Sequence, residues 1–73
     1  MSDYSVKRSI LTNREKEVFE LLVLNQSTKD IANQLKISEK TVRNHVSNTI
    51  QKLGVKGRAS AIVELVRLGE ITI

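Results

Sequence analysis

The 73-residue sequence contains no cysteine, no proline, no tryptophan and one histidine. Without cysteine it cannot form a disulfide or a thiolate metal site, and one histidine does not make a zinc site. The lack of proline and the presence of only three glycines leave long windows in which a helix can run uninterrupted. We therefore expect a small all-α domain without cofactor or metal, in which helix packing supplies the stability.

Long hydrophobic runs are missing as well. No apolar stretch approaches the length of a membrane span, and the N-terminus lacks the apolar segment of a signal peptide. These features predict a soluble, cytoplasmic protein without membrane contact.

The positive charge is concentrated in one part of the chain. Between Lys36 and Arg58 six basic residues stand against Glu39 alone, a net charge of +5, whereas the whole chain carries +4. Such a basic stretch is typical of nucleic-acid binders, although an acidic protein surface could also be its partner.

Capping signals and apolar periodicity divide the chain into a flexible N-terminal arm, residues 1–10, and one domain, residues 11–73. The start signals are Thr12 with Glu15, Ser27 with Asp30, and Ser38. The predicted helices cover approximately residues 13–25, 28–35, 39–53 and 58–68, and Gly54 is suited to end the third. On the first helix we expect Glu15 to face outward with its charged neighbours.

The third helix has two contrasting faces, and the rest of the chain is predicted to be organised around it. One face is apolar and suited to burial: Val42, Val46, Thr49, Ile50 and Leu53. The other carries side chains that can donate to base edges or phosphates: Lys40, Arg43, Asn44, Ser47, Asn48 and Gln51. Preceded by a short helix and a tight turn at Lys36 and Ile37, this helix fits the recognition helix of a helix-turn-helix unit.

The fourth helix is more apolar than a thin domain can cover. Ala61, Leu65 and Leu68 form one stripe, and Ile62, Val63 and Val66 form a second. The second stripe predicts a homodimer interface. The alternative is that the first helix and the tail Ile71-Thr72-Ile73 bury both stripes.

Five segments together resemble the signature of the LuxR-type helix-turn-helix family. They are Leu-Thr-Asn-Arg-Glu at 11–15, Lys-Asp-Ile-Ala at 29–32, Ile-Ser at 37–38, Thr-Val-Arg-Asn-His at 41–45 and Lys-Leu-Gly-Val-Lys-Gly-Arg at 52–58. The resemblance covers nearly all of residues 11–68. It implies a four-helix LuxR-type DNA-binding domain that dimerises through its last helix and controls transcription at promoters with RNA polymerase.

The resemblance also implies roles for individual residues. The family's base-reading positions correspond to Arg43, Asn44 and Ser47, with Asn48 nearby. Its phosphate-contacting positions correspond to Thr28, Lys29, Lys40, Thr41, Lys52 and Arg58. Position 43 is commonly lysine in the family and is arginine here, so the base sequence that is read stays open. The sequence is most similar to a stand-alone sporulation regulator of the family, which implies control of sporulation or spore-coat genes without a small-molecule ligand.

Two other functions remain open at this point. The promoter-binding region of a sigma factor shares the helix start and the helix-turn-helix, and a protein-interaction module could use the basic face. An enzyme is not expected, because Ser38 or Ser47 has no reason to converge with His45 and Asp30.

Overall fold

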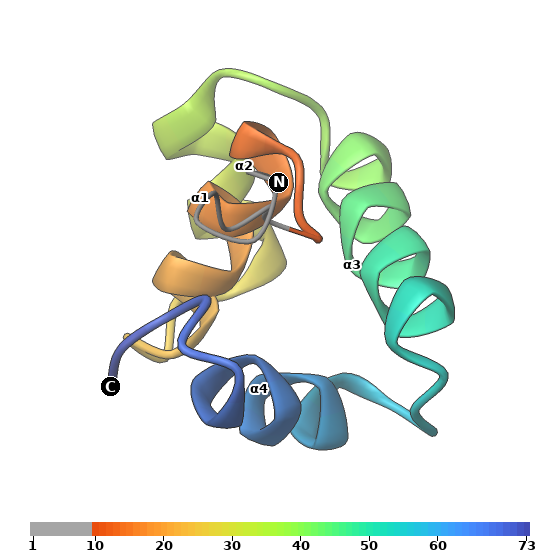
Figure 1. Cartoon of the computed structure of the whole chain (residues 1–73). Coiled ribbons are helices and arrows are strands. Elements are labelled where there is room, and N and C mark those ends of the chain that lie inside the picture. Colours follow the sequence, from red (N-terminus) through yellow and green to blue (C-terminus); the bar gives the residue numbers. More distant parts are fainter. Residues whose placement is uncertain (1–9) are drawn as a thin grey trace, which may run out of the picture.

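The computed structural model describes residues 10–73, which form four α-helices and, within that range, no strand. The helices are α1 (Asn13–Leu22), α2 (Thr28–Leu35), α3 (Glu39–Leu53) and α4 (Arg58–Arg67). Helix α3 packs against each of the other three. Figure 1 shows α3 along one edge of the molecule and α4 crossing below it. The all-α prediction is confirmed, while most of the predicted N-terminal arm lies outside the described residues.

Side chains cap the first three helices where the sequence predicts it. The Thr12 hydroxyl accepts from the Glu15 amide at 3.1 Å, and the Glu15 carboxylate accepts from the Thr12 amide at 3.0 Å. Ser27 and Asp30 exchange the same pair of hydrogen bonds. Each pair satisfies two backbone groups, one of them an amide that a helix N-terminus leaves without an intrahelical partner.

Helix α1 ends at Leu22, three residues before the predicted end. Asn25 has a left-handed backbone with φ +67°, which takes the chain out of the helix. The Asn25 and Gln26 amides then donate to carbonyls of the last turn, at Leu22 and Leu21. Asparagine adopts this conformation more readily than most residues, so the turn has a local cause.

The turn between α2 and α3 uses a second left-handed residue. Lys36 has φ +59° at the C-cap of α2, and the Ile37 amide donates to the Ala32 carbonyl. Ser38 then caps α3 by accepting from the Thr41 amide at 3.0 Å. Gly54, with φ +67°, ends α3 as predicted.

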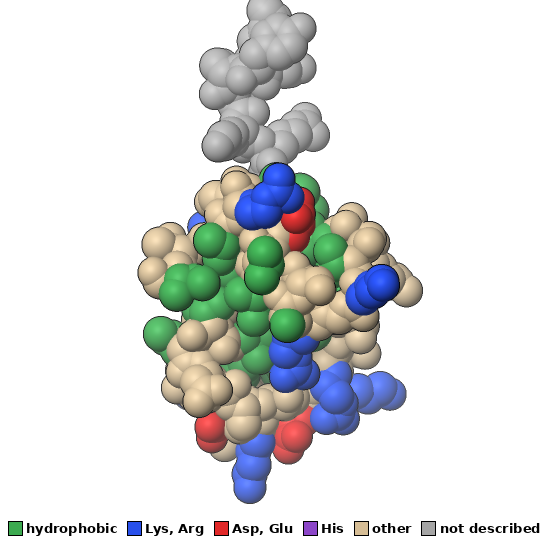
Figure 2. All heavy atoms as spheres, turned by 90° about the horizontal axis from the view of Figure 1, so that it is seen from below, with side chains coloured by type: hydrophobic (Ala, Val, Ile, Leu, Met, Phe, Trp, Pro, Cys, Tyr) green, Lys and Arg blue, Asp and Glu red, His purple; other side chains and the backbone are tan. Residues whose placement is uncertain are grey.

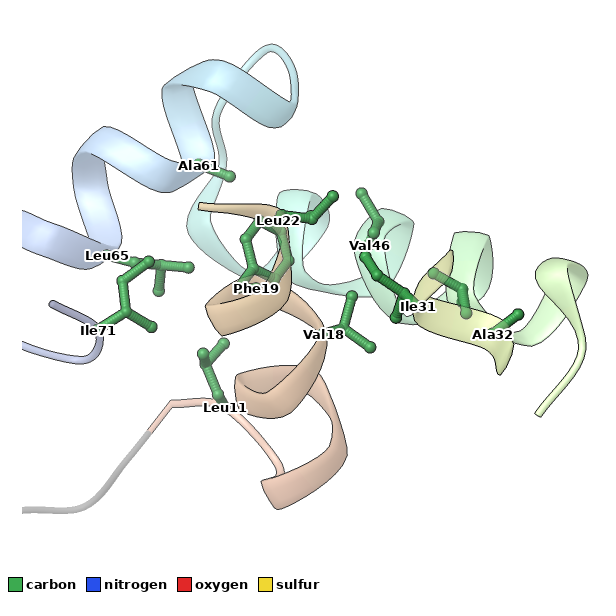
Figure 3. Packing of buried hydrophobic residues seen from close by; sticks show 11 residues of the cluster. Leu11, Val18, Phe19, Leu22, Ile31, Ala32, Val46, Ala61, Leu65 and Ile71 are labelled. Atoms are coloured by element: carbon green, nitrogen blue, oxygen red, sulfur yellow. The ribbon is translucent and has the colours of Figure 1, made fainter. Parts of the chain in front are cut away.

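A single hydrophobic core joins all four helices. It includes Val18 and Phe19 of α1, Ile31 of α2, Val42 of α3 and Leu65 of α4, all fully buried. Figure 3 shows side chains of this core, with Phe19 near its centre. The tail contributes too, since Ile71 is buried against this core. The core fixes α3 by its apolar face and leaves the opposite face to solvent.

Candidate nucleic-acid interface

The predicted base-reading side chains lie together on the solvent face of α3. Arg43, Asn44, Ser47 and Asn48 are all exposed, whereas Val42, Val46 and Thr49 behind them are buried. No other helix covers this outer side of α3 in Figure 1. A 15-residue helix is about 22 Å long, a rod that the major groove of DNA admits.

The predicted phosphate-contacting residues occupy the helix starts and the connection after α3. Lys29, Lys40 and Arg58 are exposed, and Thr28 and Thr41 are half-buried. The Thr41 hydroxyl lies 2.9 Å from that of Ser38, so it already has a partner within the cap.

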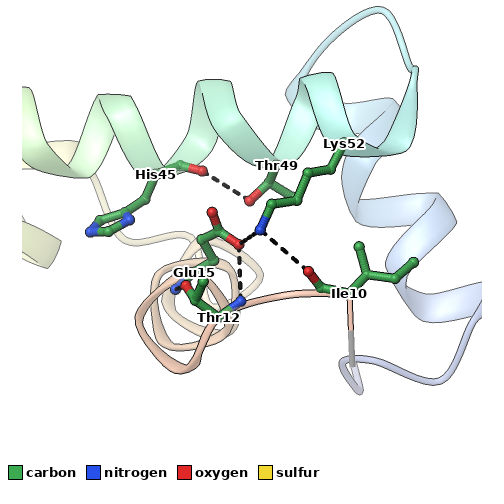
Figure 4. A network of polar contacts seen from close by, with 6 residues as sticks. All are labelled: Ile10, Thr12, Glu15, His45, Thr49 and Lys52. Carbon is green, nitrogen blue, oxygen red and sulfur yellow. Dashed lines mark hydrogen bonds and ion pairs between the residues drawn. The ribbon is translucent and has the colours of Figure 1, made fainter. Parts of the chain in front are cut away.

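Lys52 is the exception, because its ammonium group already contacts other groups of the domain. It lies 2.5 Å from the Glu15 carboxylate and also donates to the Ile10 carbonyl at 3.3 Å (Figure 4). The expectation that Glu15 faces outward is wrong: its side chain is only 4% exposed. Lys52 reaches over from α3 and supplies the opposite charge that makes this burial tolerable.

Two opposing effects act on the pKa of Glu15. Burial raises it, but the hydrogen bonds from Lys52 and from the Thr12 amide, with the positive charge of Lys52, outweigh burial and lower the pKa below its ordinary value of 4.5. The carboxylate is therefore charged at neutral pH. Next to it, the Thr49 hydroxyl donates to the His45 carbonyl at 2.9 Å, which satisfies a buried polar group on α3 (Figure 4).

Arg43 lies near a carboxylate and lines a shallow pocket. One turn before it on α3, Glu39 approaches its guanidinium to 3.7 Å. Arg43 also lines a pocket of about 260 Å³, together with Val46, Ser47, Ile50 and Arg58. The pocket brings the start of α4 beside α3, a proximity that sequence spacing alone did not indicate.

A second candidate surface lies on α4. Figure 2, which views the molecule from the α4 side, shows hydrophobic side chains gathered on this face with Lys and Arg beside them. Val63 is 61% exposed, while Ile62 and Val66 are half-buried. The alternative, in which α1 and the tail bury both stripes, is wrong for Val63, although Ile71 of the tail is itself buried.

The described residues offer little for other kinds of site. In residues 10–73 no group of three His, Cys, Asp or Glu side chains is placed to hold a metal ion. Over the same range, no helix has the length and apolarity needed to cross a bilayer.

Comparison with protein families gives a match over most of the chain. Residues 9–65 match the model described as "Bacterial regulatory proteins, luxR family". The chain is 66% identical over 64 residues to the spore germination protein GerE of Bacillus subtilis, covering 88% of this chain and 86% of GerE. It is also 44% identical over 71 residues to the transcriptional regulatory protein DegU of Brevibacillus brevis. That match covers 97% of this chain but only 30% of DegU.

Solved structures agree with these relatives. The structure of the transcription factor GerE matches with a TM-score of 0.87 and 72% identity, covering 89% of this chain and 97% of that one. The response regulator ChrA matches with a TM-score of 0.79 and 35% identity, over 97% of this chain and 35% of ChrA. These relatives are regulators and not enzymes, and they favour neither the sigma-factor nor the protein-interaction alternative. The chain belongs to the LuxR family of bacterial regulatory proteins and is a DNA-binding transcription regulator.

Proposed function

We propose that this regulator binds specific promoter sequences as a homodimer, with α3 in the major groove. The observation that carries the proposal is the division of α3 into a buried apolar face and an exposed face of paired donors. Arginine, asparagine and serine at successive exposed turns match the acceptor patterns of base edges.

In this arrangement Arg43, Asn44, Ser47 and Asn48 read bases. The Arg43 guanidinium is suited to guanine, whose O6 and N7 accept two parallel hydrogen bonds, and Asn44 is suited to adenine. The phosphate contacts come from Thr28, Lys29, Lys40, Thr41 and Arg58 at the edges of this face. Lys52 contributes through its remaining N–H, because Glu15 and Ile10 occupy the other two donors.

The dimer forms through α4, with Ile62, Val63 and Val66 in the interface. These side chains leave apolar surface in solvent that a second copy would cover. A two-fold dimer places two recognition helices in successive major grooves about 34 Å apart, on half-sites related by dyad symmetry.

The biological setting follows from the relatives. The similarity to GerE, a spore germination protein and transcription factor, supports control of sporulation or spore-coat genes. The partner of such a regulator at promoters is RNA polymerase. The place of action is the cytoplasm, where the promoter DNA lies. The chain uses no small-molecule ligand in this role.

Two variants test the division between base and phosphate contacts. Arg43→Ala should lose about 1–3 kcal/mol of binding on the preferred duplex and less on a scrambled one. Arg58→Ala should weaken both duplexes alike and make the salt dependence shallower by about one unit of slope. Equal losses on both duplexes for Arg43→Ala would assign Arg43 to a phosphate instead.

The dimer is tested by placing a charge on α4. Val63→Asp should shift the protein to monomer in sedimentation and weaken binding to a two-half-site duplex more than to a single half-site. Leu24→Asp is the control, because Leu24 is 67% exposed on the α1–α2 turn and lies outside the proposed interface. Monomerisation by both variants, or by neither, would contradict a dimer through α4.

A further inference from the structure

Glu39 places a negative charge at the start of the proposed recognition helix. It is the single acidic residue between Lys36 and Arg58, and it is the first residue of α3. Its carboxylate is exposed and lies 3.7 Å from the Arg43 guanidinium one turn further on. An acidic group at this place opposes the attraction between the basic face and any DNA, whatever its sequence.

From this geometry we infer that Glu39 is a specificity-determining residue, which acts by making Arg43 favour DNA bases over phosphates. The inference rests on the proposed function, in which Arg43 reads a base. The guanidinium carries five N–H donors in a planar fork, so it can keep its contact with Glu39 and still donate to a second acceptor.

The charge of this second acceptor decides how favourable its contact with Arg43 is. Guanine O6 and N7 are neutral acceptors, so the Glu39 carboxylate can stay on the other edge of the guanidinium when Arg43 reads guanine. A phosphate is anionic, and across the same guanidinium it would be repelled by the carboxylate. Glu39 therefore makes a phosphate contact by Arg43 less favourable than a base contact.

The pocket that Arg43 lines supports the same conclusion. Arg58 lines the same pocket as Arg43, and no acidic side chain belongs to that lining. An anion bound in this pocket would lie beside two basic residues and would compete with the DNA bases for Arg43. The Glu39 carboxylate, 3.7 Å from the Arg43 guanidinium, opposes such binding because it would repel the anion.

The test is the ratio of affinities for the preferred duplex and for a scrambled duplex of equal length. Glu39→Gln keeps the shape of the side chain and removes its charge. It should raise affinity for the scrambled duplex about three- to tenfold and raise affinity for the preferred duplex less, so that the ratio falls.

Two controls separate this effect from net charge and from helix stability. Glu17→Gln makes the same charge change on α1, where Glu17 pairs with Arg14 at 3.0 Å, and it should leave the ratio unchanged. In an Arg43→Ala background, Glu39→Gln should no longer lower the ratio. A change confined to the melting temperature would mean that Glu39 only stabilises the N-terminus of α3.

The inference is overturned if Glu39→Gln changes both affinities by the same factor, or if its effect on the ratio survives in the Arg43→Ala background. A wild-type protein that prefers no sequence at all would instead overturn the proposed function. The two failures are therefore distinguishable in one set of titrations.

Discussion

Replacing Lys52 by methionine probes the contact between Glu15 and Lys52, which joins the N-terminus of α1 to the C-terminal end of the recognition helix. The variant keeps most of the alkyl chain but removes the ammonium group. Glu15 then stays buried with the Thr12 amide, at 3.0 Å, as its remaining donor. A buried charge that loses its partner is unfavourable, so the folded state is destabilised.

The expected size follows from how buried the contact is. Removing one partner of a fully buried ion pair costs about 3–5 kcal/mol. The Lys52 side chain is 36% exposed, so water can partly replace the ammonium, and we expect a loss of about 1–3 kcal/mol. Glu15→Gln should cost less than Lys52→Met, because the amide oxygen can still accept from Thr12 and from Lys52.

Urea unfolding followed by circular dichroism measures these losses. Lys56→Met is the matched control, since Lys56 is exposed in the α3–α4 connection and its loss should change stability by no more than about 0.5 kcal/mol. Equal stabilities of the Lys52→Met and Lys56→Met variants would refute the reasoning. If Lys52→Met weakened DNA binding and left stability unchanged, Lys52 would be primarily a phosphate contact.

Three further predictions concern pH and the left-handed residues Gly54 and Lys36. Because the folded-state pKa of Glu15 is lowered, its contribution to stability is present above about pH 4.5 and is lost as pH falls below that value. The difference in stability between wild type and Lys52→Met in urea titrations should therefore shrink in acid. A difference that grows in acid would contradict this prediction. Gly54→Ala should lower stability by about 1–2 kcal/mol in thermal melts, since φ is +67° there although space around it is open; an unchanged melting temperature would count against a strained backbone. Lys36→Gly should raise stability by about 0.5–1 kcal/mol, with Lys36→Ala as the control that should bring no such gain.

Local signals in the sequence were sufficient for most of the fold. Thr12, Ser27 and Ser38 cap their helices through hydrogen bonds that span three residues, so their effect can be read from neighbouring positions. The same holds for Gly54, whose freedom at positive φ ends α3. The left-handed Lys36 was not predicted in this way, because lysine has no intrinsic preference for that conformation and the packing of α2 against α3 imposes it.

The candidate site was predictable where one helix carries it and less so where distant segments meet. The exposure of Arg43, Asn44, Ser47 and Asn48 follows from the periodicity of α3. The burial of Glu15 does not, because its partner Lys52 is 37 residues away and charged residues on α1 otherwise point outward. Such a pairing depends on how two helices pack together, and the periodicity of one helix gives no information on that packing.

The central claim, that α3 reads a specific DNA sequence, is tested most directly by selection from a random duplex pool at physiological salt. The retained duplexes should share a short motif, arranged as inverted half-sites about one helical turn apart. Selection with the Arg43→Ala variant should return a motif in which the preference at one base pair is weakened. Retention of duplexes without a common motif, by folded protein, would contradict the claim.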